Sequence, residues 1–246
     1  KSATLVRLSG AAERIGPRRR HGQWFYTRQP QADWSGHRWQ GYASLSQPAA
    51  NSPARYLPLN ASADGMKEVD AILTDIDLTD GLVAIHAGAT KTYKIWHAEQ
   101  FAALCQQLRR AGLTPLLIGA GQKDRQQIAR IQSFLCDPVI DLCDQLSLAG
   151  LIALLKRSRG FVGNDSGPMH LAAACGLPAV ALFGPTDDTL WHPLSPHAQV
   201  LRWQHCHRDC ERSSCALDSY PCLQRITVDR VVNSLEELGV IPVAHP

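Results

Sequence analysis

The chain has 246 residues, of which 45% are hydrophobic and 19% are charged, a composition typical of a globular protein with a core rather than of a disordered chain. Its net charge of +3 is too small to predict nucleic-acid binding, and no apolar run approaches the ~20 residues that span a bilayer. The first residues, KSATLVRLSG, contain no secretion signal and no initiator Met, which fits a numbering that begins inside a longer chain.

Residues 1–80 contain too few periodic segments to predict a complete domain. Residues 2–8 are predicted as a short strand and residues 65–76 as a helix, with an irregular stretch rich in Pro, Trp and Arg between them. A basic group lies in that stretch and consists of Arg18, Arg19, Arg20 and His21. It fits either a solvated loop or a docking site for an anionic partner, and the sequence leaves both open.

Residues 81–203 alternate strand and helix patterns with short breaks. Apolar runs predict strands at 82–88, 114–121, 138–144, 160–165, 178–184 and 198–203. Helical spacing predicts helices at 97–113, 123–135, 147–159, 167–176 and, after a Cys-rich loop, 227–240. This alternation predicts an α/β fold with a parallel, Rossmann-like sheet covered on both faces. Since ligands bind beyond the carboxyl ends of such strands, the loops after strands one, two and four are the candidate site.

The junction GNDSGPMH, residues 163–170, joins a buried strand directly to a helix. Ser166 occupies the predicted N-cap and Pro168 falls just inside the helix. The first backbone amides and the positive end of the helix dipole therefore point to a place where a phosphate can bind. Gly163 and Gly167 lack side chains, which lets a ligand approach the backbone closely.

Asp165 does not suit a simple phosphate site, because its charge repels the ligand. Its carboxylate is better suited to accept hydrogen bonds from sugar hydroxyls, with His170 one turn along the helix as a donor. The junction therefore predicts a nucleotide-sugar site. The alternative is that Asn164 and Asp165 only cap and turn the chain and that His170 is a core histidine.

The loop after the first strand, HAGATKTYKIW, also favours a diphosphate ligand, because it carries hydroxyl and ammonium groups between a strand and a helix. Thr90 and Lys94 are its candidate contacts, whereas Trp96 is expected to be a core residue. Asp124, in the loop after the second strand, is a candidate acceptor for ribose hydroxyls. The chain has neither the dinucleotide glycine fingerprint nor a Walker pattern, which argues against NAD binding and ATP hydrolysis.

The segment GNDSGPMHLAAACGLPAVALFGPTD closely resembles the signature of the lipopolysaccharide heptosyltransferases, glycosyltransferase family 9. The segments HAGA…KIW and LLIGAGQKD match the family in order and spacing, and the resemblance covers about residues 80–238. It implies a GT-B fold, in which two Rossmann-like lobes enclose the active site in a cleft. It also implies that the carboxyl-terminal lobe binds ADP-heptose. The heptose would be transferred with inversion, without a metal, to an anionic lipid A–Kdo acceptor or to the heptosylated core.

The resemblance assigns donor-binding roles residue by residue. Asp165 looks like the acid that contacts the heptose, and Asp124 like the ribose contact. The remaining residues resemble those around the diphosphate and sugar, namely Thr90, Lys94, Ser166, Gly167 and His170. The family's general base is an Asp in a Gly-rich loop of the amino-terminal lobe, and this sequence contains no such loop. No catalytic residue is therefore assigned, because neither Asp33 nor Asp64 lies in a matching motif.

The cysteines fall into two groups. Cys105, Cys136, Cys143 and Cys175 lie in predicted core segments and are expected to be buried as small hydrophobic residues. The others are clustered and offer ligands for a structural zinc or iron ion, although they lack the usual C-x-x-C spacing; they are Cys206, Cys210, Cys215 and Cys222. Free or occasionally oxidised thiols remain the alternative for this cluster.

The resemblance implies a GT-B type α/β protein whose donor lobe is complete and whose amino-terminal lobe is only partly present. Residues 1–80 are the expected remnant of the acceptor-side lobe, 81–226 the donor lobe with its Cys-rich loop at 204–223, and 227–246 the closing helix and tail. The expected location is the cytoplasm, with peripheral contact at the inner face of the inner membrane. Two alternatives stay open: a relative that uses another nucleotide sugar or a protein acceptor, and a sugar-nucleotide-binding module without catalysis.

Overall fold

The computed structural model describes residues 2–18, 23–46, 56–74, 81–203 and 221–242. The chain divides into two compact units, one of residues 1–55 with 189–191 and one of residues 56–188 with 192–246. Within the described ranges, no helix has both the length and the apolar character required to cross a membrane.

The smaller unit contains three short helices in its described residues 2–18 and 23–46, namely α1 (Ser2–Leu8), η1 (Gln23–Phe25) and α2 (Arg38–Ser46). The strand predicted at residues 2–8 was therefore wrong. The segment contains Ala, Leu and Arg, which favour a helix, and so short an apolar run cannot distinguish the two structures by periodicity. Trp34 packs edge-on against Tyr42, with ring centroids 5.2 Å apart.

The larger unit is built on a six-stranded sheet in which every described pair of neighbouring strands is parallel. Its strands are β1 (Leu82–His86), β2 (Thr114–Ile118), β3 (Ile140–Asp141), β4 (Gly160–Asn164), β5 (Ala179–Phe183) and β6 (Ala198–Arg202). Their order is β3-β2-β1-β4-β5-β6, which is the Rossmann order. The predicted α/β class with a Rossmann-like parallel sheet is confirmed. The third strand is shorter than its predicted range.

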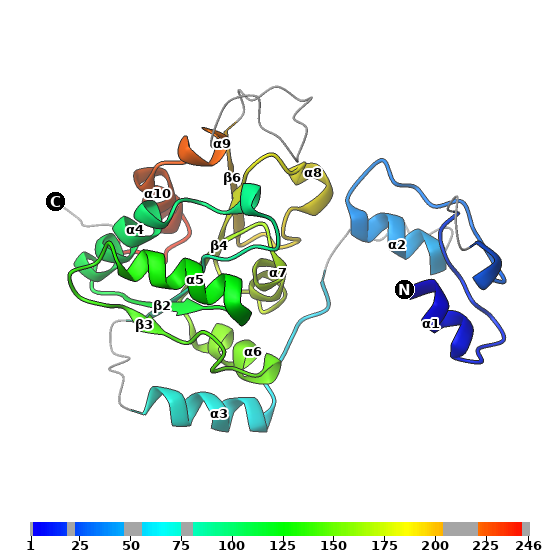
Figure 1. Cartoon of the computed structure of the whole chain (residues 1–246), viewed down its shortest axis with the longest axis horizontal. Coiled ribbons are helices and arrows are strands. Elements are labelled where there is room, and N and C mark those ends of the chain that lie inside the picture. The colour runs from blue at the N-terminus through cyan, green and yellow to red at the C-terminus, as the bar shows by residue number, and fades with distance from the viewer. Residues whose placement is uncertain (1, 19–22, 47–55, 75–80, 204–220, 243–246) are drawn as a thin grey trace. The chain divides into compact units, whose positions relative to one another are not determined.

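Helices cover both faces of this sheet (Figure 1). One face is covered by α4 (Ala98–Arg110), α5 (Gly121–Gln132) and α10 (Val228–Glu237), and the other by α3 (Ala63–Leu73), α6 (Leu148–Arg157) and α7 (Gly167–Ala174). The sequence did not predict the short helices η2 (Thr92–Lys94), α8 (Asp188–Trp191) and α9 (Pro221–Gln224).

Side chains of successive strand residues alternate between two hydrophobic layers. In β1, Val83 and Ile85 pack with α4, α5 and α10, whereas Leu82 and Ala84 pack with α3, α6 and α7. Both layers are hydrophobic, so the central strands are apolar up to their last residues, His86 and Asn164, and their sequences read as apolar runs.

The cysteines in predicted core segments follow this layering only in part. Cys105 and Cys175 are buried, and burial raises the pKa of the Cys105 thiol to about 12, so it packs as an apolar group. Cys143 is half-buried and Cys136 is exposed. The prediction for Cys136 was wrong because α5 ends at Gln132 and the chain turns outward before residue 136.

Helix α3 lies beside α6 in the larger unit, although its sequence was grouped with residues 1–80 (Figure 1). The Glu68 carboxylate accepts hydrogen bonds from the Ser147 hydroxyl at 2.5 Å and from the Ser147 amide at 2.6 Å. These two bonds hold the pKa of Glu68 below its ordinary value. Gly65 lets the helices approach closely, because a Cβ there would lie 2.4 Å from the carbonyl oxygen of Ala149.

The substitution Gly65→Val should therefore destabilise the larger unit. The new side chain meets backbone rather than a flexible side chain, so the two helices must separate, and overpacking of this kind costs about 1–3 kcal/mol. Thermal unfolding of both proteins measures the effect. Lys67→Ala, on the exposed side of the same helix, is the control and should unfold as the wild type does. Equal melting temperatures for all three proteins would contradict the close approach of α3 and α6.

Candidate functional site

The candidate site lies where β1 and β4 end side by side. These two strands are neighbours in the sheet, and the chain runs outward from them in opposite directions, to β2 and β3 on one side and to β5 and β6 on the other. Loops from the two halves separate at such a point and leave a crevice at the carboxyl edge, where ligands bind in open parallel sheets.

Asn164, the last residue of β4, holds the two strand ends together. Its Oδ1 accepts a hydrogen bond from the Trp96 amide at 3.0 Å, and its Nδ2 donates to the carbonyl of Ala87 at 2.8 Å and of Gly88 at 3.3 Å. Asn164 and Trp96 are both fully buried. Trp96 is the core residue that the sequence predicted, and its Nε1 donates to the carbonyl of Ile226 at 2.9 Å.

Asp165 and Lys94, which the sequence placed in separate loops, form an ion pair with 2.6 Å between Nζ and Oδ2. The Asp165 side chain is only 6% exposed and that of Lys94 is 22% exposed. A buried carboxylate requires such a partner, because desolvation otherwise opposes its charge. An ammonium has three N–H donors, and the contact with Asp165 uses one of them. The pair therefore presents a cation at the crevice beside a fixed carboxylate.

The beginning of α7 is open to a ligand. Ser166 has extended backbone angles and occupies the N-cap position, but its side chain makes no capping hydrogen bond. Its hydroxyl lies instead 3.0 Å from Nδ1 of His86 and 3.1 Å from the carbonyl oxygen of Asn164. A Cβ on Gly167 would meet nothing within 4 Å. The first amides of the helix and its positive dipole end are thus left to an incoming anion.

Asp124, in the first turn of α5, is held tightly between the ends of β1 and β2. A Cβ on Gly119 would lie 2.7 Å from the Cβ of Asp124, and a Cβ on Gly88 would lie 1.9 Å from its Oδ1, so a side chain at either position would displace Asp124. The Oδ2 atom accepts from the Ala120 amide at 2.9 Å and lies 3.3 Å from Nε2 of His86.

Opposing effects set the pKa of the Asp124 carboxyl. Burial raises this pKa, but the hydrogen bonds from His86 and from the Ala120 amide, together with the electrostatic interaction with the His86 ring, lower it by more. The net pKa lies below its ordinary value, so Asp124 is a carboxylate at neutral pH. It is therefore an acceptor of hydrogen bonds, as a contact for ribose hydroxyls requires.

A cavity of about 360 Å³ lies between Asp124 and the beginning of α7. Its polar lining residues are His86, Asp124 and Ser147, and the rest of the wall is formed by Ile118, Gly119, Ala120, Leu146, Leu148, Leu151 and Pro168. A mostly apolar wall with a few polar groups is typical of small-molecule pockets, and this volume is in their usual range. The arrangement can take a flat apolar group that carries hydroxyls at one end and an anion at the other.

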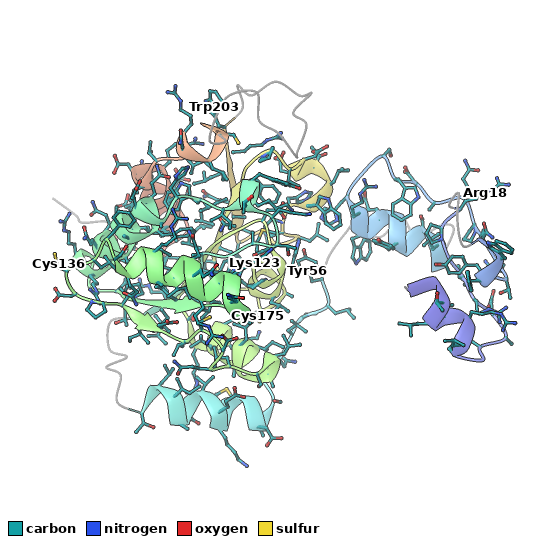
Figure 2. The ribbon with its side chains drawn as sticks, in the orientation of Figure 1. Arg18, Tyr56, Lys123, Cys136, Cys175 and Trp203 are labelled. Carbon is teal, nitrogen blue, oxygen red and sulfur yellow. The ribbon has the colours of Figure 1, made fainter. Side chains whose placement is uncertain are left out.

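Two predicted site residues have different surroundings from those expected. His170 contacts the hydroxyl of Tyr56 through Nδ1, and the two rings meet edge-on with centroids 5.9 Å apart. Figure 2 shows Tyr56 beside α7. Thr90 is exposed, and its backbone carbonyl accepts from Lys123 at 3.4 Å. The structure thus brings Lys94, Asp165, Ser166 and Gly167 together, with Asp124 joined to them through His86, while Thr90 and His170 contact Lys123 and Tyr56 instead.

Other candidates add little to the site. Cys206, Cys210 and Cys215 lie outside the described residues, and Cys222 is buried in α9, so the metal cluster stays a prediction. Elsewhere in the part of the chain that the structure describes, no group of three or more His, Cys, Asp or Glu residues could hold a metal ion. Of the basic group, Arg18 is described and exposed, while Arg19, Arg20 and His21 fall in an undescribed range.

The two acids that were left unassigned, Asp33 and Asp64, have ordinary structural positions. Asp33 accepts from the Ser35 amide and hydroxyl in a turn, and Asp64 lies in the first turn of α3. His86 was missed by the sequence reasoning. The available signal was that it is the one ionisable residue in the apolar run LVAIHAG, at a strand end that faces the crevice.

Comparison with known proteins places the chain among glycosyltransferases. Residues 1–221 match the family described as glycosyltransferase family 9 (heptosyltransferase). Lipopolysaccharide heptosyltransferase 3 of Escherichia coli is 31% identical over 131 residues, which are 52% of this chain and 38% of that protein. Lipopolysaccharide heptosyltransferase 2 of Salmonella typhimurium is 32% identical over 149 residues, which are 59% of this chain and 42% of that protein. The matches thus span about two fifths of these relatives.

Solved structures share the fold. The structure of E. coli ADP-heptose lps heptosyltransferase II has a TM-score of 0.81 and 24% identity, with 96% of this chain and 72% of that chain covered. E. coli heptosyltransferase WaaC with ADP has a TM-score of 0.62 and 20% identity, with 88% and 61% covered. The expected relation to GT-B heptosyltransferase folds is confirmed, and the family match extends into residues 1–80, beyond the range in which the signature motifs were recognised.

The pairing of Asp165 with Lys94 makes a prediction about stability. Lys94→Ala should lower the free energy of unfolding by about 1–3 kcal/mol, because it leaves the buried Asp165 carboxylate without its partner. The double variant Lys94→Ala/Asp165→Asn should regain most of that loss, since a neutral amide needs no cation. Denaturant unfolding measures both, with Lys91→Ala, an exposed lysine of the same loop, as the control. Equal destabilisation in the single and double variants would show that the charge pair is not what matters.

Proposed function

Because the chain belongs to glycosyltransferase family 9, we propose that it moves a heptose from ADP-heptose to the inner core of lipopolysaccharide, with inversion at the anomeric carbon. The observation that carries this proposal is the Lys94–Asp165 pair at the mouth of α7, next to a cavity of nucleoside size. An ADP-sugar has a flat aromatic base, a ribose, a diphosphate and a second sugar in that order. The crevice offers matching groups in the same order.

The nucleoside would occupy the cavity. Its base would pack against the apolar wall that includes Leu148 and Leu151, and its ribose hydroxyls would donate to the Asp124 carboxylate. The low pKa of Asp124 supports this role, because only the ionised form accepts from both neighbouring hydroxyls. Pro168 belongs to the same wall and to the first turn of α7, so a nucleoside bound there directs its phosphates toward the helix mouth.

The diphosphate would bind at the beginning of α7. The open position above Gly167, the uncapped first amides and the Lys94 ammonium all favour an anion there. Thr90 would contribute from the edge of the same loop. Lys94 would then lie between the diphosphate and Asp165, which offsets the repulsion between the two negative charges.

The chemistry that these residues support is departure of ADP. As the bond between the anomeric carbon and the phosphate oxygen breaks, negative charge develops on the diphosphate, and Lys94 with the dipole of α7 stabilises it. Asp165 would accept from heptose hydroxyls and hold the sugar, with His170 one turn further along. The acceptor hydroxyl would attack from the opposite face, which inverts the anomeric centre. This assignment uses no metal in the reaction and leaves the general base unassigned.

The acceptor in this proposal is an anionic glycolipid of the lipid A–Kdo type or its heptosylated form. Such an acceptor lies in a membrane, so the protein would meet it by peripheral contact at the inner face of the inner membrane. The heptosyltransferase names of the sequence relatives support this acceptor class.

Asp165→Asn should lower kcat with ADP-heptose and a lipid A–Kdo acceptor roughly a hundredfold, because the amide keeps the shape but loses the charge that holds the sugar in the transition state. Its melting temperature should stay close to that of the wild type, since Lys94 is partly exposed and tolerates the loss of its partner. Product formation is followed by mass spectrometry.

The control is Asp229→Asn, which removes a carboxylate from the exposed face of α10 and should leave kcat unchanged. Wild-type turnover in Asp165→Asn would remove Asp165 from the site. Transfer from UDP-sugars in preference to ADP-heptose by the wild type would replace the proposed donor with another nucleotide sugar.

A further inference from the structure

His86 contacts both halves of the proposed donor site, yet the proposed function gives it no task. It ends β1 with its side chain buried, and each ring nitrogen lies near a side chain from a different helix. Nδ1 lies 3.0 Å from the Ser166 hydroxyl at the beginning of α7, and Nε2 lies 3.3 Å from the Asp124 carboxylate of α5.

The hydrogen-bonding groups determine the roles of the two nitrogens. A carboxylate only accepts, so Nε2 carries the proton and donates to Asp124. In the neutral ring Nδ1 is then an acceptor, and the Ser166 hydroxyl donates to it. The Ser166 hydroxyl has one proton and two acceptors within reach, so Nδ1 of His86 competes for that proton with the carbonyl of Asn164.

Neither partner of His86 is fixed by its own helix alone. Ser166 occupies an N-cap position without capping, and its hydroxyl lies instead beside Nδ1 of His86 and the carbonyl of Asn164. Asp124 packs closely against Gly88 and Gly119 at the ends of β1 and β2, and its Oδ2 is shared between the Ala120 amide and His86. The imidazole is therefore a rigid spacer between a carboxylate on one helix and a hydroxyl on the other.

We propose that His86 is a positioning residue that sets the spacing between the nucleoside part and the diphosphate part of the donor site. It does so by holding Asp124 through Nε2 and Ser166 through Nδ1. That one part binds a nucleoside and the other a diphosphate rests on the proposed function. A rigid connection of this kind lowers the cost of ordering both groups when one ligand spans them.

Two conservative substitutions separate the two contacts. An Asn side chain places its amide near the position of Nδ1, so His86→Asn keeps a partner for Ser166 and loses the one for Asp124. A Gln side chain reaches the position of Nε2, so His86→Gln keeps the donor to Asp124 and loses the contact with Ser166. His86→Phe keeps a ring and loses both. The control is His97→Asn, at the N-cap of α4, where the histidine side chain makes no capping hydrogen bond.

The probes are inorganic pyrophosphate, adenosine and ADP, with dissociation constants from NMR titration of the whole chain. His86→Asn should bind pyrophosphate as the wild type does and adenosine about tenfold more weakly, the equivalent of one hydrogen bond. His86→Gln should show the reverse. His86→Phe should lose affinity for both fragments, and His97→Asn should change neither.

The pattern across variants decides the proposal, and melting temperatures are measured alongside. Wild-type affinities in His86→Phe would overturn it. A second contrary result would be that His86→Asn and His86→Gln each lose the same affinity for pyrophosphate and for adenosine, in proportion to their drop in melting temperature. A histidine with a merely structural role would act in that way. A wild-type chain that binds none of the three probes would overturn the proposed function itself, and this inference with it.

Discussion

The side-chain amide of Asn164 fixes the geometry on which the candidate site depends. It is fully buried and joins the end of β4 to the end of β1 and to the loop that leads into α4. A buried amide whose partners are removed costs about 1–3 kcal/mol for each polar group left unpaired, so the two strand ends cannot move independently. Asp165 and Ser166 are the next two residues along the chain. Their directions are therefore set by the same hydrogen bonds that close the sheet.

Charge balance around this point explains how an anion site can contain two carboxylates. Asp165 is neutralised by Lys94, and Asp124 lies beside His86 while also accepting from a backbone amide. Each acid is thus held by a hydrogen-bond donor before any ligand arrives, and the mouth of α7 between them is left with free donors and a positive dipole. A sugar nucleotide alternates hydroxyl-bearing and anionic parts. A site that alternates acceptors with donors is complementary to that order. Inorganic phosphate, in contrast, would occupy only the anion-binding part of the site at the beginning of α7.

The sequence predicted the sheet well because its central strands are buried on both faces and read as apolar runs between helical patterns. Residues in the loops that follow the strands, such as Lys94 and Asp165, could be placed at one edge for the same reason. Contacts between residues far apart in the chain were not predictable: Tyr56 and His170 are separated by 114 positions, and neither periodicity nor spacing connects them. Residues 2–8 were misassigned because so short an apolar run fits the periodicity of a helix and that of a strand equally well. His86 was overlooked because its partners lie on two helices that its strand pattern does not reveal.

The most direct test of this account is a crystal structure of the whole chain with ADP. The account predicts that the diphosphate binds at the beginning of α7 within hydrogen-bond distance of Lys94 Nζ, and that the adenosine fills the cavity with its ribose on Asp124. ADP bound elsewhere, with the cavity empty and Lys94 still paired only with Asp165, would contradict it.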